Sequence, residues 1–337
     1  MEETCTSEKF IGNMLNLFTN KIIYEPLERM KEILKLSSRI ILCLTIIVII
    51  PFIILITGIC YFGFLFINKN YNKYEQLVEL IRNVKCNNNS NYMNYGYWKK
   101  NNNNLYKANK NLCKEIFKKG ELDKAETILD VGCGYGEQDF YWKKKTTAKI
   151  HAIDINKHSI KKAKKLNIDE NITFQIGNAC KLDFNNNSFD RVVNLESGFH
   201  YNPRLQFLKE SHRVLKPGGK LVVADILYND NSIDIFNVLN RNAFGKLFDI
   251  PECNRISIDE FKKQLEDIGY RVKIEDITDK TFKPYYNYFF SNVECPDNFI
   301  LPRFIFDIMR ISAGFYINNI CNGTNGFKYV IALCEKK

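Results

Sequence analysis

The sequence predicts an α/β protein whose mainly parallel sheet carries helices on both faces, preceded by a hydrophobic membrane segment. Three observations support this fold class. Strand and helix patterns alternate from Leu105 onward, the order that builds parallel sheets. The stretch Thr127–Glu137 has the pattern of a strand that enters a glycine-rich turn and then a helix. Residues Ile40–Ile67 form a long run without charge.

The composition is that of a basic globular protein. The 337 residues are 45% hydrophobic and 26% charged, with a formal net charge of +10. The positive charge follows either from a coding bias that also favours Asn and Ile, or from attraction to anionic lipid or nucleic acid. The 11 cysteines contain no CxxC pair. This argues against a zinc site or a disulfide framework, so we expect no metal and a reducing compartment.

Residues 1–39 are predicted to form an amphipathic N-terminal segment. Apolar residues recur at roughly helical spacing between residues 7 and 36, and Pro26 interrupts the pattern. The segment fits either a helix in a membrane interface or a helix packed on the protein itself.

Residues 40–67 are predicted to be a transmembrane or membrane-hairpin segment. They are mostly Ile, Leu, Val and Phe, and the run exceeds the roughly 20 residues that cross a bilayer. Pro51 near its middle allows a tilted span or a hairpin. Basic residues flank both ends, so the positive-inside rule gives no orientation. Residues 68–90 follow as a linker.

Residues 91–337 are predicted to form the globular domain, with a tight turn at Lys216–Gly219 before the fifth strand. Helices are expected at residues 105–119, 157–166, 204–214 and 259–268. Strands are expected at residues 127–131, 149–154, 172–177, 189–195, 220–226, 271–278 and 329–334.

Glycine occupies every second position of the turn after the first strand, at Gly132, Gly134 and Gly136. Glycine lets the backbone adopt positive φ and lets a ligand sit against the main chain. The next helix points its free N–H groups at the anionic part of that ligand. The spacing differs from the dinucleotide pattern G-x-G-x-x-G. Within the turn, Cys133 suits a small packing residue better than a nucleophile.

Polar residues follow the other parallel strands. Asp154 ends the second strand some twenty residues after the glycine turn, where a carboxylate can accept the hydroxyls of a ribose. It also suits a helix N-cap. Asn178 and Ala179 follow the third strand, and Asn194 lies at the end of the fourth. Because ligands of such sheets bind outside the carboxyl ends of the strands, we expect the site at this edge.

Five stretches, in order and spacing, resemble the motifs of class I S-adenosylmethionine (SAM) methyltransferases: DVGCGYG, AIDIN, GNACKLDF, SFDRVVNLES and RVLKPGGKLVVAD. The resemblance covers roughly residues 91–337. It implies a Rossmann-like seven-stranded sheet whose last strand is antiparallel. It also implies SAM as co-substrate and a catalytic domain that faces the cytosol, where SAM is made.

The resemblance assigns the cofactor contacts by position. Asp154, with Ile155 beside it, would hold the ribose, and Asn194 would border the cofactor. Asn178 and Ala179 would meet the adenine; many relatives have Asp in place of this Asn, so we expect weaker selectivity there. The methionine and ribose end of SAM would be lined by Asp130, Gly132, Cys133, Gly134 and Gly136.

Two further stretches resemble a subset that includes the tocopherol, sterol and demethylrifamycin methyltransferases. Met93–Trp98 resembles an N-terminal segment that closes over cofactor and acceptor, and Glu196–His200 resembles an E-[SA]-x-x-H stretch. Enzymes of this subset methylate hydroxyls or carbons of lipophilic small molecules. The resemblance therefore implies a small lipophilic acceptor.

A hydroxyl acceptor needs a base, and His200 is the candidate because its ordinary pKa of about 6.5 suits proton removal near neutral pH. A structural histidine is the alternative. Glu196 either holds His200 in place or touches the cationic centre of the cofactor. Tyr97, Trp98 and Tyr201 are expected in the acceptor pocket. The aromatic connection at residues 279–328 forms either a lid over that pocket or extra helices packed on the sheet.

Other functions fit less well. The Pro-Pro-aromatic motif of amino-group base methylases is absent after the fourth strand, so no nucleic-acid substrate is expected. A protein methyltransferase has no positive sign in the sequence. A non-catalytic membrane scaffold with this fold is the rival from another class, and the intact glycine turn and Asp154 argue against it.

Overall fold

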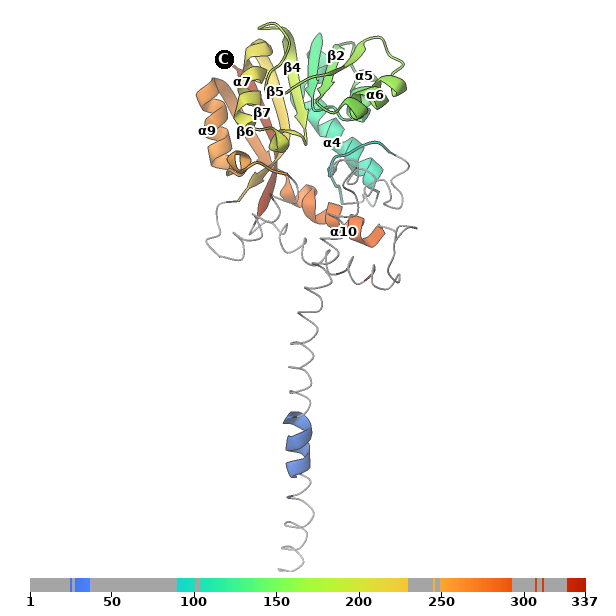
Figure 1. Ribbon diagram of the computed structural model, residues 1–337, viewed down its shortest axis with the longest axis vertical. Coiled ribbons are helices and arrows are strands. Elements are labelled where there is room, and N and C mark those ends of the chain that lie inside the picture. The colour runs from blue at the N-terminus through green and yellow to red at the C-terminus, as the bar shows by residue number, and fades with distance from the viewer. Residues whose placement is uncertain are drawn as a thin grey trace, which may run out of the picture. The chain divides into compact units, whose positions relative to one another are not determined.

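The computed structural model describes residues 25, 28–36, 90–100, 104–229, 245, 249–292, 307, 311 and 326–337 (Figure 1). The chain divides into two compact units, residues 1–71 and 72–337. In the first unit, residues 28–36 are helical and exposed, as the apolar spacing predicts. Pro26 and the predicted membrane segment at residues 40–67 lie outside the described residues. Among those described, no helix is long and apolar enough to span a bilayer.

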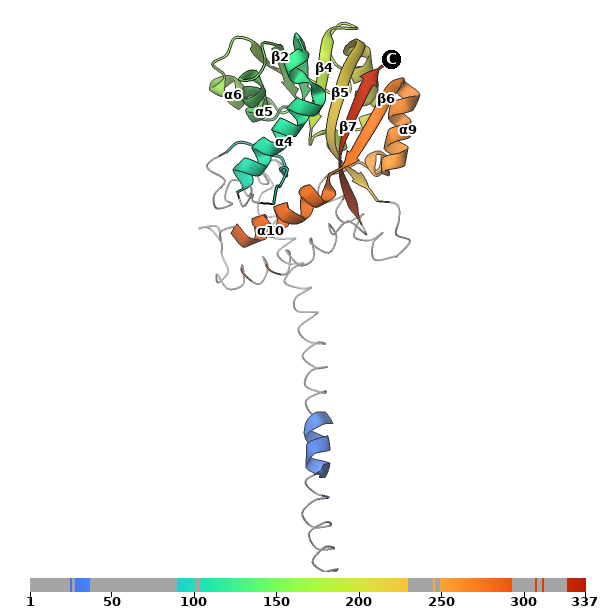
Figure 2. The same cartoon turned by 180° about the vertical axis from the view of Figure 1, so that it is seen from behind.

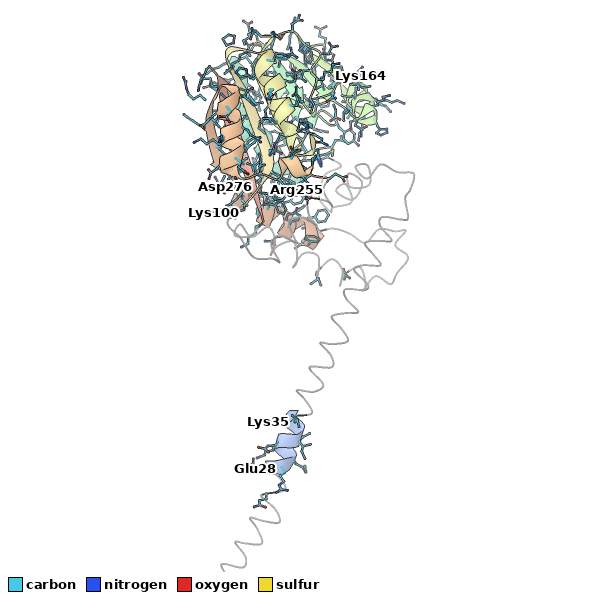
Figure 3. All side chains as sticks on the ribbon, turned by 60° about the vertical axis from the view of Figure 1, so that its left-hand side comes forward. Glu28, Lys35, Lys100, Lys164, Arg255 and Asp276 are labelled. Carbon is cyan, nitrogen blue, oxygen red and sulfur yellow. The ribbon has the colours of Figure 1, made fainter. Side chains whose placement is uncertain are left out.

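The second unit is built on a seven-stranded sheet in the order β3-β2-β1-β4-β5-β7-β6. All neighbouring strands are parallel except that β7 runs antiparallel to both β5 and β6. Figure 3 labels Asp276, the last residue of β6, and Lys164, on the helix of residues 157–166. The strands are β1 Thr127–Val131, β2 Lys149–Asp154, β3 Ile172–Ile176, β4 Phe189–Leu195, β5 Leu215–Tyr228, β6 Tyr270–Asp276 and β7 Phe327–Lys336.

Helices cover both faces of this sheet, as predicted (Figures 1 and 2). One core cluster joins side chains of α4, α5, α6 and α10 to the sheet, and the other joins those of α7 and α9. Neighbouring strand residues alternate between them: Ile128 belongs to the first cluster and Leu129 to the second. The helices are α4 Leu105–Gly120, α5 Glu137–Lys143, α6 Lys157–Leu166, α7 Arg204–Val214, α9 Ile258–Ile268 and α10 Phe282–Asn292.

Local signals explain where these helices begin and end. The side chain of Asn156 caps α6 by accepting from the amides of His158 and Ser159. Ser257 and Glu260 form a capping box at the start of α9, and Gly269 ends it in the left-handed conformation. These are the residue types from which the sequence predicts helix ends.

The tight turn predicted at Lys216–Gly219 is instead an irregularity inside β5. Leu215 pairs with Phe189, whereas the next pair is Lys220 with Arg191. Four residues of β5 therefore stand opposite one residue of β4, and Gly218 has a φ of 72°. Some strand ends also differ from expectation, because residues 278–280 form a short 3-10 helix and β7 extends over ten residues.

Candidate active site

The strand order reverses between β1 and β4, and the site lies at their carboxyl ends. β1 pairs with β2 on one side and with β4 on the other, so the chain winds outward in opposite directions from this point. In open α/β sheets the crevice at such a switch point binds the ligand. The glycine turn follows β1, and Glu196 follows β4.

The glycine turn adopts backbone conformations that other residues disfavour. Gly132, Gly134 and Gly136 have φ values of 82°, 56° and 77°. A Cβ at Gly132 would lie 2.6 Å from the hydroxyl of Tyr201 and closer than 3.0 Å to the Oγ of Ser197. Gly136 is the N-cap of α5. The turn therefore needs glycine for its φ angles and, at Gly132, for close packing as well.

Asp154 fixes the glycine turn to the end of β2. One carboxylate oxygen accepts from the amide of Gly134 at 2.9 Å, and the other accepts from the amide of Asn156 at 2.8 Å. The N-cap of α6 is Asn156, so Asp154 is not the capping residue. Burial raises the pKa of Asp154. A half-buried carboxylate is thus oriented beside the turn.

Asp130 lies beneath the turn and is fully buried. It accepts a hydrogen bond from Gln138 at 2.9 Å, and Gln138 also donates to the carbonyl of Cys133 at 2.9 Å. Asp139 is equally buried and neighbours Asp130, and burial raises the pKa of Asp130 to about 7 and that of Asp139 well above its usual range. Burial of the two neighbouring carboxyl groups therefore favours the protonated form of the pair. Asp130 supports the turn from below through Gln138.

A network of polar side chains closes the other side of Gly132. Asn194 is fully buried and donates to the carbonyl of Val131 at 2.8 Å. Ser197 and Tyr201 join their hydroxyls at 2.8 Å, and each also lies 3.1 Å from the same carbonyl. The predicted site residues Asn194 and Tyr201 are thus brought together, with their polar groups directed at β1.

His200 sits in the short 3-10 helix Gly198–His200 that follows β4. Its Nδ1 lies 3.5 Å from the carbonyl of Asp249, and its ring lies 4.1 Å from that of Phe199. Although the residue is exposed, desolvation of its ring lowers the pKa of His200. The imidazole is therefore neutral near pH 7 and able to accept a proton.

The backbone around His200 is held by buried polar groups. The amide of Phe199 donates to Asp225 at 3.1 Å, and its carbonyl accepts from Asn254 at 3.1 Å. Asp225 in turn pairs with Arg204 at 2.8 Å, and both side chains are almost completely buried. The sequence analysis did not identify Arg204, Asp225 or Asn254, because only their contacts with the segment that carries His200 connect them to the site.

Glu196 does not hold His200. Its two oxygens accept from the amide of Tyr95 at 2.8 and 3.0 Å, and the hydroxyl of Tyr329 donates to it. Burial raises the pKa of Glu196 to about 8. Of the two predicted roles, the first is not supported, because the Tyr95 amide and the Tyr329 hydroxyl occupy the Glu196 carboxyl, while the His200 ring faces the carbonyl of Asp249.

The remaining predicted residues lie around this edge. Trp98 is buried against Tyr288 and donates from its Nε1 to the carbonyl of Tyr95 at 2.9 Å. The amide of Tyr97 donates to Ala108 at 2.8 Å. Beyond β2 and β3, Ile155 is 71% exposed, Ala179 is buried, and Asn178 accepts from the amide of Cys180 at 2.9 Å.

Acidic side chains gather at this edge, and burial raises the pKa of each of them. Four carboxyl groups surround the glycine turn, namely those of Asp130, Asp139, Asp154 and Glu196. Within the part of the chain that the structure describes, none of the four forms an ion pair. Buried acids without a basic partner favour a ligand that brings its own positive charge. The fold and the site together define a doubly wound α/β protein with a candidate ligand site at its switch point.

Comparison with known proteins gives the family. Residues 129–223 match the family described as a methyltransferase domain. The chain is 32% identical over 213 residues to erythromycin 3''-O-methyltransferase of Saccharopolyspora erythraea, covering 60% of this chain and 70% of that protein. It is 34% identical over 150 residues to 2-methyl-6-phytyl-1,4-hydroquinone methyltransferase of Synechocystis, covering 44% and 47%. The chain belongs to the class I SAM-dependent methyltransferases.

Solved structures share the fold at lower identity. The [4+2]-cyclase SpnF superposes with a TM-score of 0.55 at 21% identity, over 72% of this chain and 88% of that one. Geranyl diphosphate C-methyltransferase from Streptomyces coelicolor A3(2) superposes with a TM-score of 0.60 at 15% identity, over 80% and 99%.

Proposed function

We propose that this protein is a membrane-anchored enzyme that transfers the methyl group of SAM to an oxygen or carbon of a small lipophilic acceptor. The observation that carries the proposal is the glycine turn at the switch point, tied by its Gly134 amide to Asp154 and surrounded by acids that form no ion pair among the described residues. SAM carries a sulfonium and an ammonium group, so this surrounding suits its charge.

The residues at the carboxyl edge fit the parts of SAM. Because the glycines of residues 132–136 have no side chains, the methionine and ribose end of SAM can lie against their backbone amides. Asp154 is oriented for ribose hydroxyls. The exposed Ile155 and the loop at Asn178 and Ala179 lie past the ends of the next two strands, where the adenine is expected. When bound, SAM supplies an activated methyl group for in-line displacement, so the protein mainly aligns the acceptor and excludes water.

A hydroxyl acceptor would lose its proton to His200. This imidazole stays neutral at neutral pH, and its turn is held by Asp225 and Asn254, so its position is fixed before an acceptor binds. Tyr97, Trp98 and Tyr201 remain the candidate acceptor contacts. The relatives support this acceptor class, because their names describe methylation of erythromycin and of a phytyl hydroquinone.

Membrane attachment rests on the sequence of residues 40–67, which carries no charge over a length sufficient to cross a bilayer. A segment of this kind would bring the domain to a membrane-dissolved acceptor, with residues 68–90 as linker and residues 91–337 as the catalytic domain facing the cytosol. No nucleic-acid substrate is proposed, and no metal is required.

The rival proposal is a protein of this fold that does not transfer methyl groups, a possibility that the likeness to a [4+2]-cyclase illustrates. The test incubates the full-length protein with membrane lipid extracts and isotopically labelled SAM, followed by mass spectrometry. A lipophilic product that carries the label is expected. SAM binding by calorimetry without any labelled product would favour the rival, and no binding at submillimolar SAM would sink both the enzyme and its cofactor assignment.

A further inference from the structure

The segment Ser90–Trp98, here called the strap, is tied to the far end of the glycine turn. Asn91 donates to the carboxylate of Glu137 at 2.9 Å, and its carbonyl oxygen accepts from Lys162 at 2.6 Å. Glu137 is the first residue of α5 and directly follows Gly136. One end of the strap is therefore fixed beside the point where the turn enters its helix.

The strap is also tied to the near end of the turn. The amide of Tyr95 donates to both oxygens of Glu196. Glu196 directly precedes Ser197, whose hydroxyl packs against Gly132. The strap thus connects the two ends of the glycine turn across the edge at which the cofactor is proposed to bind.

Aromatic rings enclose the side chain of Tyr95 at this second attachment. The ring of Tyr95 lies 4.7 Å from that of Tyr285, 5.3 Å from Phe282 and 6.2 Å from Tyr329, all at steep angles. The hydroxyl of Tyr329 donates to Glu196 as well. Tyr329, which the sequence patterns did not single out, therefore contacts both partners of the strap contact.

Glu196 has an unusual backbone and, among the residues that the structure describes, no positively charged neighbour. Its φ of 53° is in the left-handed region, where a non-glycine residue is strained. Five described groups interact with its carboxyl, namely Tyr95 of the strap, Cys113 of α4, Asp225 of β5, Tyr285 of α10 and Tyr329 of β7. None of them is a cation. The Glu196 carboxyl is therefore stabilised in its buried position by the hydrogen bonds from the Tyr95 amide and the Tyr329 hydroxyl and not by an ion pair.

We propose that Glu196, supported by Tyr329, is a positioning residue that holds the strap closed over the glycine turn, and that release of this contact admits the cofactor. The identity of that cofactor rests on the proposed function. Glu196 then acts through the strap and does not touch the reacting atoms.

The closed strap should be favoured by protonation. With the strap closed, burial raises the pKa of Glu196 to about 8. With the strap open, water reaches the carboxyl and its pKa returns toward the ordinary value of about 4.3. The closed state therefore binds the proton more tightly. The free-energy contribution of this proton to the closed state is complete below the ordinary pKa of Glu and is lost as pH rises toward about 8.

Hydrogen exchange of the strap tests the contact directly. The full-length protein in detergent is compared with Glu196→Ala and Glu196→Gln, by mass spectrometry of peptides that cover residues 90–98. Alanine is expected to raise strap exchange by up to about tenfold, the size that follows from losing the hydrogen bond between the Tyr95 amide and the Glu196 carboxyl. Peptides from β1 and β4 should not change, which shows that the sheet remains folded.

The pH dependence of strap exchange shows whether the titrating carboxyl of Glu196 holds the strap closed or whether packing alone does. Exchange of the wild-type strap, corrected for the intrinsic rate, should rise by up to about tenfold per pH unit between pH 5 and 8, because opening releases one proton. The Glu196→Gln strap should show no such rise, since an amide does not titrate. If the alanine variant does not fold, this comparison still decides. The matched control is Glu210→Gln, which alters another carboxylate that accepts a backbone amide, at 2.8 Å from Leu182.

Whether strap release admits the cofactor is tested by measuring the association rate of SAM with stopped-flow spectroscopy. Glu196→Ala should bind SAM faster than the wild type at pH 6, and Glu210→Gln should not. Two results would overturn the role of Glu196 in holding the strap closed. One is an alanine variant whose strap exchanges as slowly as that of the wild type. The other is a glutamine variant whose strap exchange keeps the full pH dependence. Faster strap exchange in Glu196→Ala with an unchanged association rate of SAM would overturn the proposal that strap release admits the cofactor. If no variant binds SAM, the proposed function fails, whereas the exchange data still decide the role of Glu196.

Discussion

The amide of Gly134 donates to the carboxylate of Asp154 at 2.9 Å, across the 20 residues that separate the glycine turn from the end of β2. The neighbouring amides of Gly132 and Cys133 donate to the carbonyl of Ile153 at 2.8 and 3.0 Å. The turn and the end of β2 therefore behave as one unit. A change at Asp154 alters both a ligand contact and the support of the turn.

Replacing Asp154 by alanine should weaken SAM binding about tenfold to a hundredfold, because one hydrogen bond to a charged group and one negative charge are lost. Asp154→Asn should lose less, since its oxygen can still accept from Gly134. Isothermal titration with SAM measures both. The control is Asp169→Ala, which removes a similar loop carboxylate that accepts from Asn171 at 2.9 Å. Equal losses in the control and the Asp154 variants would remove Asp154 from the ribose contact.

Gly132→Ala and Gly218→Ala separate backbone strain from steric conflict. Both glycines have positive φ, at 82° and 72°. A Cβ at Gly218 meets nothing within 4 Å, whereas at Gly132 it would collide with Ser197. Gly218→Ala should therefore cost about 1–2 kcal/mol of stability from strain alone and leave SAM affinity unchanged. Gly132→Ala should cost more and abolish SAM binding. Thermal unfolding and titration measure the two effects, and equal effects of both variants would contradict the close packing at Gly132.

The buried pair Asp130 and Asp139 should make the protein less stable as pH rises. Burial raises the pKa of Asp130 to about 7, so in the folded protein the pair keeps a proton that it would lose in the unfolded chain. This contribution is complete below the ordinary Asp pKa of about 3.9 and is lost as pH rises through about 7. The melting temperature should fall between pH 5 and 8, and Asp139→Asn should flatten that fall. An unchanged slope in this variant, with Asp169→Asn as reference, would argue against the shared proton.

The sheet could be predicted because both of its faces are buried. Most residues of strands β1 and β4 are apolar and buried, so the bounds predicted from the sequence agree with the structure. The glycine turn and Asp154 were predictable because their residue types have few other uses at strand ends. The strap contact was not, since Tyr95 and Glu196 lie 101 residues apart and a backbone amide leaves no sequence signal. Asp139 was missed because an acid in the first turn of a helix is ordinarily exposed.

Arg204 and Asp225 form the buried ion pair that supports the turn carrying His200. Arg204→Met should cost about 3–5 kcal/mol, because Asp225 is left buried without its partner. The double variant Arg204→Met with Asp225→Asn should recover part of this loss, since the asparagine removes the charge and can still accept from Phe199. Denaturant unfolding measures both. The exposed pair Lys262 and Glu266, 3.8 Å apart, provides the control, and Lys262→Met should cost about 0.5 kcal/mol or less.

Removing residues 1–67 should release the protein from membranes and leave its SAM affinity unchanged. The compact unit that contains the site begins at residue 72, so the deletion ends before it. The uncharged residues 40–67 supply the apolar length that a bilayer requires. In fractionated cells the full-length chain should stay with membranes after high-salt and carbonate washing, whereas the truncated chain should appear in the supernatant and bind SAM in calorimetry. A truncated chain that remains with carbonate-washed membranes would place the anchor within residues 68–337.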